Sequence, residues 1–274
     1  MAASYENQLN DWISKEKSGI HDGIFGFYNL IKTLKKENFE KVYIFSSSLR
    51  YALIANFSGI KKIYQYRLFK KQGQNIVTAA KKFTEQSLGT QVSTEPKLYL
   101  DEKLINDAKK KYNFSKEFKN ICVGLSASGP TKRWNIEKFI DTFTKISKEI
   151  PCKFYLAGGK SDLPLIEKFK NTSLGKSSVS FENMTINETL PIIANCDLYV
   201  GNDTGWLHLS TALNLKSIAL FMDSPVMAYG KYSSNIKVIV PANETEATTT
   251  HNTQGKDKIN VEEVFDAVKN NLIN

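Results

Sequence analysis

Short apolar runs alternate with segments of helical period from residue 121 to the end of the chain. The runs predict strands at 121–126, 152–157, 179–181, 197–200, 217–221 and 236–240. Apolar positions three or four residues apart predict helices at 135–149, 162–170, 187–195, 205–213 and 261–272, with Asn187 and Asn260 as N-caps of two of them. This alternation is typical of a parallel sheet with crossover helices, so we expect a complete doubly wound α/β domain.

The first part of the chain carries fewer such signals. Helical spacing is found at 25–36, 49–57 and 74–88, a strand is predicted at 41–46, and weaker strand candidates lie at 62–66 and 97–100. A lone strand cannot form a stable sheet, so this part predicts a small, curtailed α/β lobe. Segment 89–95 and the Lys-rich run before Phe114 are plausible linkers, and 247–258 is expected to be a surface loop. We therefore expect one domain over 1–115 and another over 116–274.

Composition narrows the class of protein. The chain has 274 residues, of which 41% are hydrophobic. This is enough to form one large or two modest hydrophobic cores without a disulfide scaffold. Its three cysteines, Cys122, Cys152 and Cys196, lie in or beside apolar runs and lack metal-ligand spacing, which predicts buried thiols in a reducing compartment. No run approaches a membrane span, and the N-terminus lacks the features of a signal peptide. A cytoplasmic location is expected.

The positive charge gathers in the first part of the chain. Residues 1–115 contain 19 Lys/Arg against 11 Asp/Glu, whereas residues 116–274 contain 18 against 17. Such a bias attracts anionic partners such as nucleic acid, anionic lipid or phosphorylated sugars, and does not choose among them. The basic residues come mostly as pairs without a nucleic-acid-binding motif, so a solvated helix face is the simpler reading and nucleic acid is not the expected partner.

Three polar turns follow predicted strands of the second domain. The first, Ser126-Ala127-Ser128-Gly129-Pro130-Thr131-Lys132, combines small residues, hydroxyls and a lysine, which suit a phosphate; it lacks the spacing of a P-loop. The second is Gly158-Gly159-Lys160-Ser161-Asp162, and the third is Asn202-Asp203-Thr204-Gly205 with His208 beyond it. The carboxyl ends of parallel strands share one sheet edge, where ligands bind in open α/β sheets.

Each turn also has a purely structural interpretation. The first turn could be an ordinary strand-to-helix connection. Asp162 could accept hydrogen bonds from a ribose or cap the following helix, and Asp203 could likewise be a cap. His208 could be an ordinary packed or surface histidine. The presence of Lys132 at the same edge favours an anion site over three independent caps.

These residues resemble glycosyltransferase family nine, the bacterial lipopolysaccharide heptosyltransferases. The resemblance rests on segment 126–134, the Gly158-Gly159 pair, and above all the Asn-Asp-Thr-Gly element at 202–205 with His208. It extends to segment 221–225, similar to the family's Phe-Gly-Pro-Thr-x-Pro but with Met222-Asp223 in the middle. It implies a GT-B architecture, with two Rossmann-like lobes and a nucleotide-sugar held mainly by the C-terminal lobe.

The resemblance also implies roles for individual residues. Lys132 and the Thr204/Gly205 backbone would hold the diphosphate and stabilise the leaving group, with added hydroxyls from Ser126 and Ser128. Asp162 would bind the ribose, and Met184 would pack near the adenine. Asp203 and His208 would lie by the sugar-diphosphate. Family members invert the anomeric centre by direct displacement and need no metal or other cofactor.

One feature departs from the family. The family opens with a strand and a Gly-Asp turn whose aspartate is the proposed general base, and residues 1–20 are unlike that strand. Asp22, in His21-Asp22-Gly23, resembles the aspartate of that Gly-Asp turn only weakly, because no apolar strand precedes it. No general base is therefore identified. The leading hypothesis is an inverting transferase of heptose from an ADP-sugar to an anionic lipopolysaccharide core acceptor, and peripheral contact with the inner membrane surface is expected as well. The alternative is a catalytically weak nucleotide-sugar-binding member.

Overall fold

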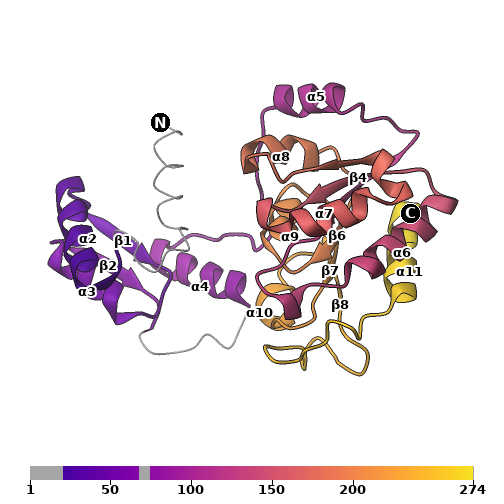
Figure 1. Cartoon of the computed structure of the whole chain (residues 1–274). Helices are drawn as coiled ribbons and strands as arrows, with labels where there is room; N and C mark the ends of the chain where they lie inside the picture. Colours follow the sequence, from indigo (N-terminus) through magenta and orange to yellow (C-terminus); the bar gives the residue numbers. More distant parts are fainter. Residues whose placement is uncertain (1–20, 68–74, 274) are drawn as a thin grey trace. The chain divides into compact units, whose positions relative to one another are not determined.

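The computed structural model describes residues 21–67 and 75–273, which form two compact units (Figure 1). Of these residues, 21–67 and 82–91 belong to the smaller unit, and 75–81 and 92–273 belong to the larger one. These units differ from the expected ranges, since 92–115 falls in the larger one. Ala108 and Phe114 explain why, because both are buried in its core.

The smaller unit is a short parallel sheet covered by helices. In chain order its elements are α2 Gly23–Glu37, β1 Lys41–Ile44, α3 Leu49–Phe57 and β2 Lys62–Gln65. Strands β1 and β2 pair in parallel with Lys41 opposite Lys62, and the rings of Tyr43 and Tyr64 stack at 5.0 Å between centroids. The weaker strand candidate at 62–66 is therefore confirmed. Helix α4, Ile76–Leu88, follows and is divided between the two units.

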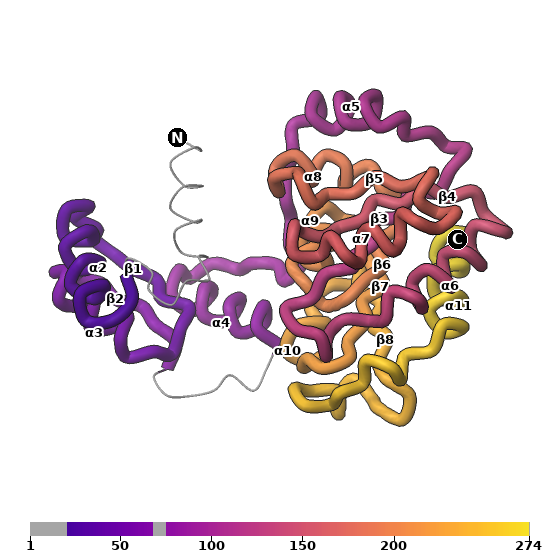
Figure 2. The backbone as a smooth tube through the Cα atoms, in the orientation of Figure 1, coloured from indigo at the N-terminus to yellow at the C-terminus, as the bar shows by residue number. Residues whose placement is uncertain are grey.

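The larger unit is built on six parallel strands in the order β5-β4-β3-β6-β7-β8. The strands are β3 Lys119–Gly124, β4 Cys152–Ala157, β5 Ser178–Ser180, β6 Leu198–Asn202, β7 Ser217–Leu220 and β8 Ile236–Ile239. The order runs outward from β3 in one direction and from β6 in the other, which is the doubly wound arrangement expected from the sequence. Figure 2 follows the same chain path as a tube.

Helices cover both faces of this sheet. They are α5 Glu102–Lys111, α6 Ile136–Glu149, α7 Leu163–Lys170, α8 Ile186–Ile193, α9 Gly205–Ala212, α10 Val226–Tyr229 and α11 Val261–Ile273. Three short 3-10 helices lie between them: η1 Pro130–Lys132, η2 Lys160–Asp162 and η3 Ser173–Ser177. Helices α6 and α11 lie side by side (Figure 2).

Alternation along the central strands divides the core into two layers. In β3, Ile121 and Val123 join the cluster with α6, α7 and α11, whereas Cys122 joins the cluster with α8 and α9 on the other face. Strands buried on both faces must be apolar throughout, which is why they appeared in the sequence as continuous apolar runs. Cys122, Cys152 and Cys196 are free and buried, as predicted.

Some local expectations were wrong. Segment 97–100 forms no strand, although the Leu98 N–H donates to the Ala212 carbonyl at 2.8 Å. Helix α8 begins at Ile186, and its N-cap is Thr185, which forms a capping box with Glu188, rather than Asn187. Among the described residues, no helix combines the length and apolar character needed to cross a bilayer.

Candidate functional site

Two glycines bring β3 and β6 close together where the strand order reverses. Gly124 lies opposite Gly201 in the register of these strands. A Cβ on Gly201 would lie 2.5 Å from the Gly124 Cα, and one on Gly124 would lie 2.0 Å from the Tyr199 hydroxyl. Neither position can therefore carry a side chain without moving its surroundings. Just beyond this contact, at the carboxyl ends of the strands, the polar turns begin.

A cleft of about 390 Å³ opens at this edge. It is lined by Ser126, Ala127, Ser128, Lys132, Ser161, Asp162, Asp203, Thr204, Gly205, His208 and Tyr229. The structure thus brings together eight of the nine residues expected at the site. Met184 is the exception: it packs half-buried against the core near Phe181 and does not line the cleft. Its proposed place near an adenine stays a prediction.

The first turn is held by the buried amide of Asn202, the last residue of β6. Its Oδ1 accepts the Trp134 N–H at 3.0 Å, and its Nδ2 donates to the Leu125 and Ser126 carbonyls at 3.1 and 3.2 Å. One side chain therefore fixes both ends of the turn, where the chain leaves β3 and where it approaches α6. Between these positions, η1 presents Lys132 to the cleft.

The third turn starts α9. Thr204 is the N-cap, and its Oγ1 accepts the Trp206 N–H at 3.3 Å. The capping interpretation of Asp203 is therefore wrong, and its carboxylate is available to the cleft. Thr204 and Gly205 present the N-terminus of α9 to the same space as Lys132. A lysine and a helix N-terminus both attract an anion, so this end of the cleft suits phosphate groups.

Asp203 belongs to a chain of polar contacts that includes His208. The carboxylate accepts the Ser224 hydroxyl at 2.6 Å and lies 3.8 Å from His208 Nε2, while His208 Nδ1 is 2.6 Å from the Tyr232 hydroxyl. Partial burial lowers the pKa of His208, and the Asp203 charge opposes this effect only in part. Near neutral pH the imidazole is therefore neutral. It can then accept or donate a hydrogen bond according to its tautomer.

Asp162 is more constrained than the sequence suggested. It is 5% exposed; one carboxylate oxygen accepts the Gly159 N–H at 3.0 Å and the other lies 3.3 Å from the Arg133 guanidinium. The structural interpretation is thus partly confirmed, although the cap serves η2 and not α7. Asp162 still lines the cleft, and carboxylate oxygens can accept more than one hydrogen bond.

Ser161 and Tyr229 line the cleft without having been singled out in the sequence as site residues. Ser161 stands between the glycine pair and Asp162, so its position in the second turn was a usable signal. Tyr229 ends α10 and reaches the cleft only through the packing of that helix, which no local pattern reveals. Asp22, the weak candidate for a base, directly precedes α2 in the smaller unit.

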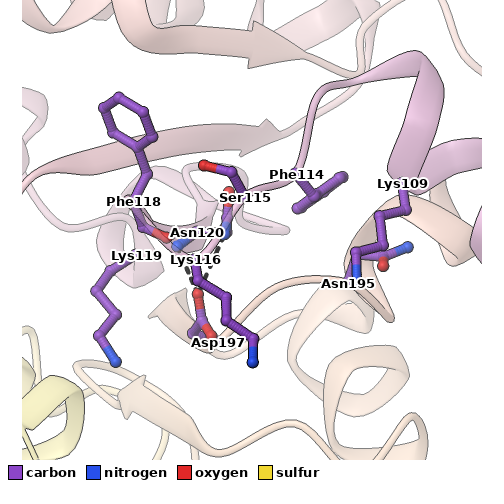
Figure 3. Close-up of a pocket in the computed structure, with 9 residues that line it drawn as sticks. All are labelled: Lys109, Phe114, Ser115, Lys116, Phe118, Lys119, Asn120, Asn195 and Asp197. Carbon is purple, nitrogen blue, oxygen red and sulfur yellow. Dashed lines mark hydrogen bonds between the residues drawn. The ribbon is translucent and has the colours of Figure 1, made fainter.

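A second cleft, of about 440 Å³, lies at the opposite edge of the sheet, where β3 begins (Figure 3). Its lining includes Lys116, Lys119, Asn120 and Asp197. There the Asp197 carboxylate accepts the Asn120 backbone N–H at 2.7 Å and the Asn120 amide at 3.3 Å. Asp197 and Asn120 thus satisfy one another's hydrogen-bonding groups, and none of the predicted site residues lies here. The candidate site is therefore the cleft at the carboxyl edge.

No cluster of three or more His, Cys, Asp or Glu side chains suited to a metal ion occurs in the described ranges 21–67 and 75–273. The charged groups that converge on the carboxyl-edge cleft are Lys132, Asp162, Asp203 and the N-terminus of α9. Together they offer attraction for an anion and acceptors for hydroxyl groups. That combination suits a phosphorylated compound that also carries sugar hydroxyls.

Comparisons with known proteins agree with this chemistry. The family model described as glycosyltransferase family 9 (heptosyltransferase) matches residues 27–259. Lipopolysaccharide heptosyltransferase 1 of Campylobacter coli is 29% identical over 159 residues, which are 56% of this chain and 45% of that protein. Lipooligosaccharide heptosyltransferase 2 of Haemophilus influenzae is 31% identical over 108 residues, 37% of this chain and 30% of that protein. Each alignment thus spans less than half of the relative.

Solved structures extend the likeness of fold over most of the chain. The structure of E. coli ADP-heptose LPS heptosyltransferase II has a TM-score of 0.70 at 19% identity, covering 91% of this chain and 81% of that one. E. coli heptosyltransferase WaaC with ADP has a TM-score of 0.61 at 15% identity, covering 97% and 82%. At these identities the likeness establishes the fold, and the expected GT-B architecture is confirmed.

Proposed function

Because the chain belongs to glycosyltransferase family 9, we propose that it transfers a heptose from ADP-heptose to a lipopolysaccharide core acceptor. The observation that carries the proposal is the convergence of Lys132, Thr204 and Gly205 on one cleft at the carboxyl edge of the sheet. The names of the similar proteins, which include an ADP-heptose lipopolysaccharide heptosyltransferase, support this choice of donor and acceptor.

In the proposed complex, the diphosphate lies between Lys132 and the N-terminus of α9. Ser126 and Ser128, which line the same cleft, add hydroxyl donors. Asp162 faces the ribose, while Asp203 and His208 face the sugar end, where a carboxylate and a neutral imidazole can bind hydroxyls. Met184 is placed near the adenine by family resemblance.

The proposed reaction is a direct displacement with inversion. The acceptor hydroxyl oxygen forms a bond to the anomeric carbon, the bond from that carbon to the ADP oxygen breaks, and the hydroxyl proton passes to a base. ADP leaves with the electron pair, so negative charge grows on the diphosphate. Lys132 and the α9 N-terminus stabilise that charge, the task a metal ion performs in other transferases. We accordingly propose a metal-independent reaction.

Binding of ADP to the full chain tests the donor site. Isothermal titration should give an affinity that Lys132→Ala weakens by roughly 10- to 100-fold, the effect of losing a charge-assisted contact of about 1.5–3 kcal/mol. The exposed Lys176, outside the cleft, supplies the control: Lys176→Ala removes the same charge and should leave the affinity unchanged. Equal affinities of wild type and Lys132→Ala would refute the diphosphate assignment.

Turnover tests the chemistry. Labelled ADP-heptose and a core acceptor should give product of inverted anomeric configuration by NMR, with a rate that EDTA leaves unchanged. ADP binding without any turnover would instead support the alternative of a nucleotide-sugar-binding protein. The same assay tests where the enzyme works, because we propose a peripheral location at the cytoplasmic face of the inner membrane. When the acceptor is placed in anionic vesicles, the enzyme should bind to the vesicle surface.

A further inference from the structure

Tyr232 contacts a residue of the donor cleft without lining the cleft itself. It lies between α10 and β8, is 7% exposed, and belongs to the same core cluster as Leu207 and Ile236. Its hydroxyl oxygen is 2.6 Å from His208 Nδ1, and the centroids of the two rings are 5.6 Å apart. This distance is that of a hydrogen bond. The role of Tyr232 therefore depends on which of the two atoms carries the shared proton.

Each partner has one proton to place. Burial raises the pKa of Tyr232 to about 12, so its hydroxyl keeps its proton at neutral pH. Burial lowers the pKa of His208, so the neutral imidazole carries one proton, on either Nδ1 or Nε2. With the proton on Nδ1, the imidazole donates to Tyr232 and Nε2 presents a lone pair. With the proton on Nε2, the phenol donates to Nδ1 and Nε2 presents an N–H.

The Asp203 carboxylate decides between these two arrangements. Its Oδ1 is 3.8 Å from His208 Nε2, and its Oδ2 accepts the Ser224 hydroxyl at 2.6 Å. The separation of 3.8 Å is too long for a hydrogen bond. At that distance, however, an anionic oxygen repels a nitrogen lone pair and attracts an N–H, and the carboxylate side chain is only 10% exposed to screening water. The proton therefore belongs on Nε2, and Tyr232 is the donor to Nδ1.

Nε2 is also the nitrogen that remains for a ligand. His208 and Asp203 line the cleft, and the imidazole side chain is 40% exposed, whereas Nδ1 is occupied by Tyr232. An Nε2–H can donate to a hydroxyl or phosphate oxygen. It cannot take a proton from an acceptor hydroxyl, because the lone pair of the ring is on Nδ1 and is already engaged. The tautomer thus separates two chemical roles for the same residue.

We propose that Tyr232 is a positioning residue that donates its hydroxyl to His208 Nδ1 and keeps the imidazole proton on Nε2. His208 then binds the donor sugar as a hydrogen-bond donor and is not the general base. The identity of the ligand rests on the proposed function, whereas the position of the proton does not. The proposal also gives a role to a residue that lies in none of the three polar turns.

Heteronuclear NMR of the isotope-labelled full chain, without nucleotide, tests the tautomer directly. The chain has three histidines, so the His208 signals can be assigned by their loss in His208→Gln, with exposed His251 as a reference. Wild type should show a protonated Nε2. Tyr232→Phe should shift the tautomer ratio about 5-fold toward Nδ1–H, the effect of losing a hydrogen bond of about 1 kcal/mol. A wild-type Nδ1–H tautomer, or an unchanged ratio in folded Tyr232→Phe, overturns the proposal.

Two variants control this measurement. Tyr112→Phe removes a hydroxyl from a tyrosine that packs partly buried against the same core cluster, and it should leave the ratio unchanged. Thr211 of α9 donates its own hydroxyl to the Leu207 carbonyl at 2.8 Å, and its oxygen is the alternative acceptor for the proton of Tyr232. If Tyr232 donates to His208, Thr211→Val should leave the ratio unchanged as well. A shift in Thr211→Val would mean that the phenol proton points to Thr211, and the proposal would be wrong.

Turnover separates a hydrogen-bond donor from a base. A glutamine amide donates a hydrogen bond but does not take up a proton at neutral pH. His208→Gln should therefore keep transfer from ADP-heptose within about 10-fold of wild type, and His208→Ala should lose more. Loss of a general base costs roughly 100- to 10,000-fold, so a loss of that size in His208→Gln contradicts the assignment. Wild type without turnover refutes the proposed function, and the NMR result then decides alone about Tyr232.

Discussion

Replacement of Asn202 by alanine should destabilise the larger unit and disorganise its donor cleft. The amide is fully buried and makes three hydrogen bonds, all to the backbone of the turn between β3 and α6. Alanine removes the acceptor and the donor together. The Trp134 N–H and the Leu125 carbonyl, in residues that are each 1% exposed, then stay buried without this partner. The carbonyl of half-buried Ser126 can instead bind water.

The magnitude follows from the two groups that stay buried, the Trp134 N–H and the Leu125 carbonyl. A buried group left unsatisfied costs about 1–3 kcal/mol, so two such groups give a loss of roughly 3 kcal/mol. For a unit of this size, that corresponds to a fall in Tm of roughly 6–12 °C. Asn202→Asp should be at least as harmful, because it places a buried charge opposite two carbonyl oxygens.

Thermal unfolding followed by tryptophan fluorescence measures the effect. Asn183→Ala, the same truncation at an exposed position, is the control and should change the unfolding free energy by less than about 0.5 kcal/mol. ADP titration of the folded variant should also give weaker binding, because Ser126, Ser128 and Lys132 stand on the turn that Asn202 holds. If Asn202→Ala unfolded at the same temperature as the control, the amide would contribute nothing net, and our account of the turn would be wrong.

Two further predictions concern the same sheet edge. Because partial burial lowers the pKa of His208 below its ordinary 6.5, the unfolded chain binds more protons just below that pH, and stability should fall as the pH drops through about 6.5 toward the folded pKa. Urea titrations should show wild type losing stability relative to His208→Gln over that range, and parallel curves would contradict the assignment. Gly201→Ala places a Cβ 2.5 Å from the Gly124 Cα, so it should cost about 3 kcal/mol. Gly205→Ala, which meets open space, should cost far less in the same thermal scans.

The elements of the larger unit could be predicted closely, because its core imposes simple patterns on the sequence. Strands such as β4 and β6 are buried on both faces and appear as continuous apolar runs, and the helices between them keep an apolar stripe. The expectation failed at 97–100, where an extended segment makes a single backbone bond to Ala212 and no ladder. Strand pairing depends on a partner distant in sequence, so a local pattern cannot establish it.

Caps were less predictable than elements. Asn187 and Asp203 are both good capping residues, yet Thr185 and Thr204 take the two caps. The side chains Asn, Asp, Ser and Thr compete for such positions on nearly equal terms, and the backbone angles at the helix start decide among them. For Asp203 the outcome matters, because a carboxylate released from capping can face the cleft.

The sequence alone shows polar turns after three strands of a parallel sheet, and therefore that these turns meet at one edge, since the carboxyl ends of parallel strands all point the same way. It also supplied the Asp-Thr-Gly element, Lys132 and the family to which they belong. Which side chains are free to bind a ligand depends on tertiary contacts. The carboxylate of Asp162 is partly engaged by Arg133 and Gly159, and Met184 packs against the core. The reason is physical: hydrogen bonds among buried groups join residues far apart in the chain, and spacing along the sequence does not record them.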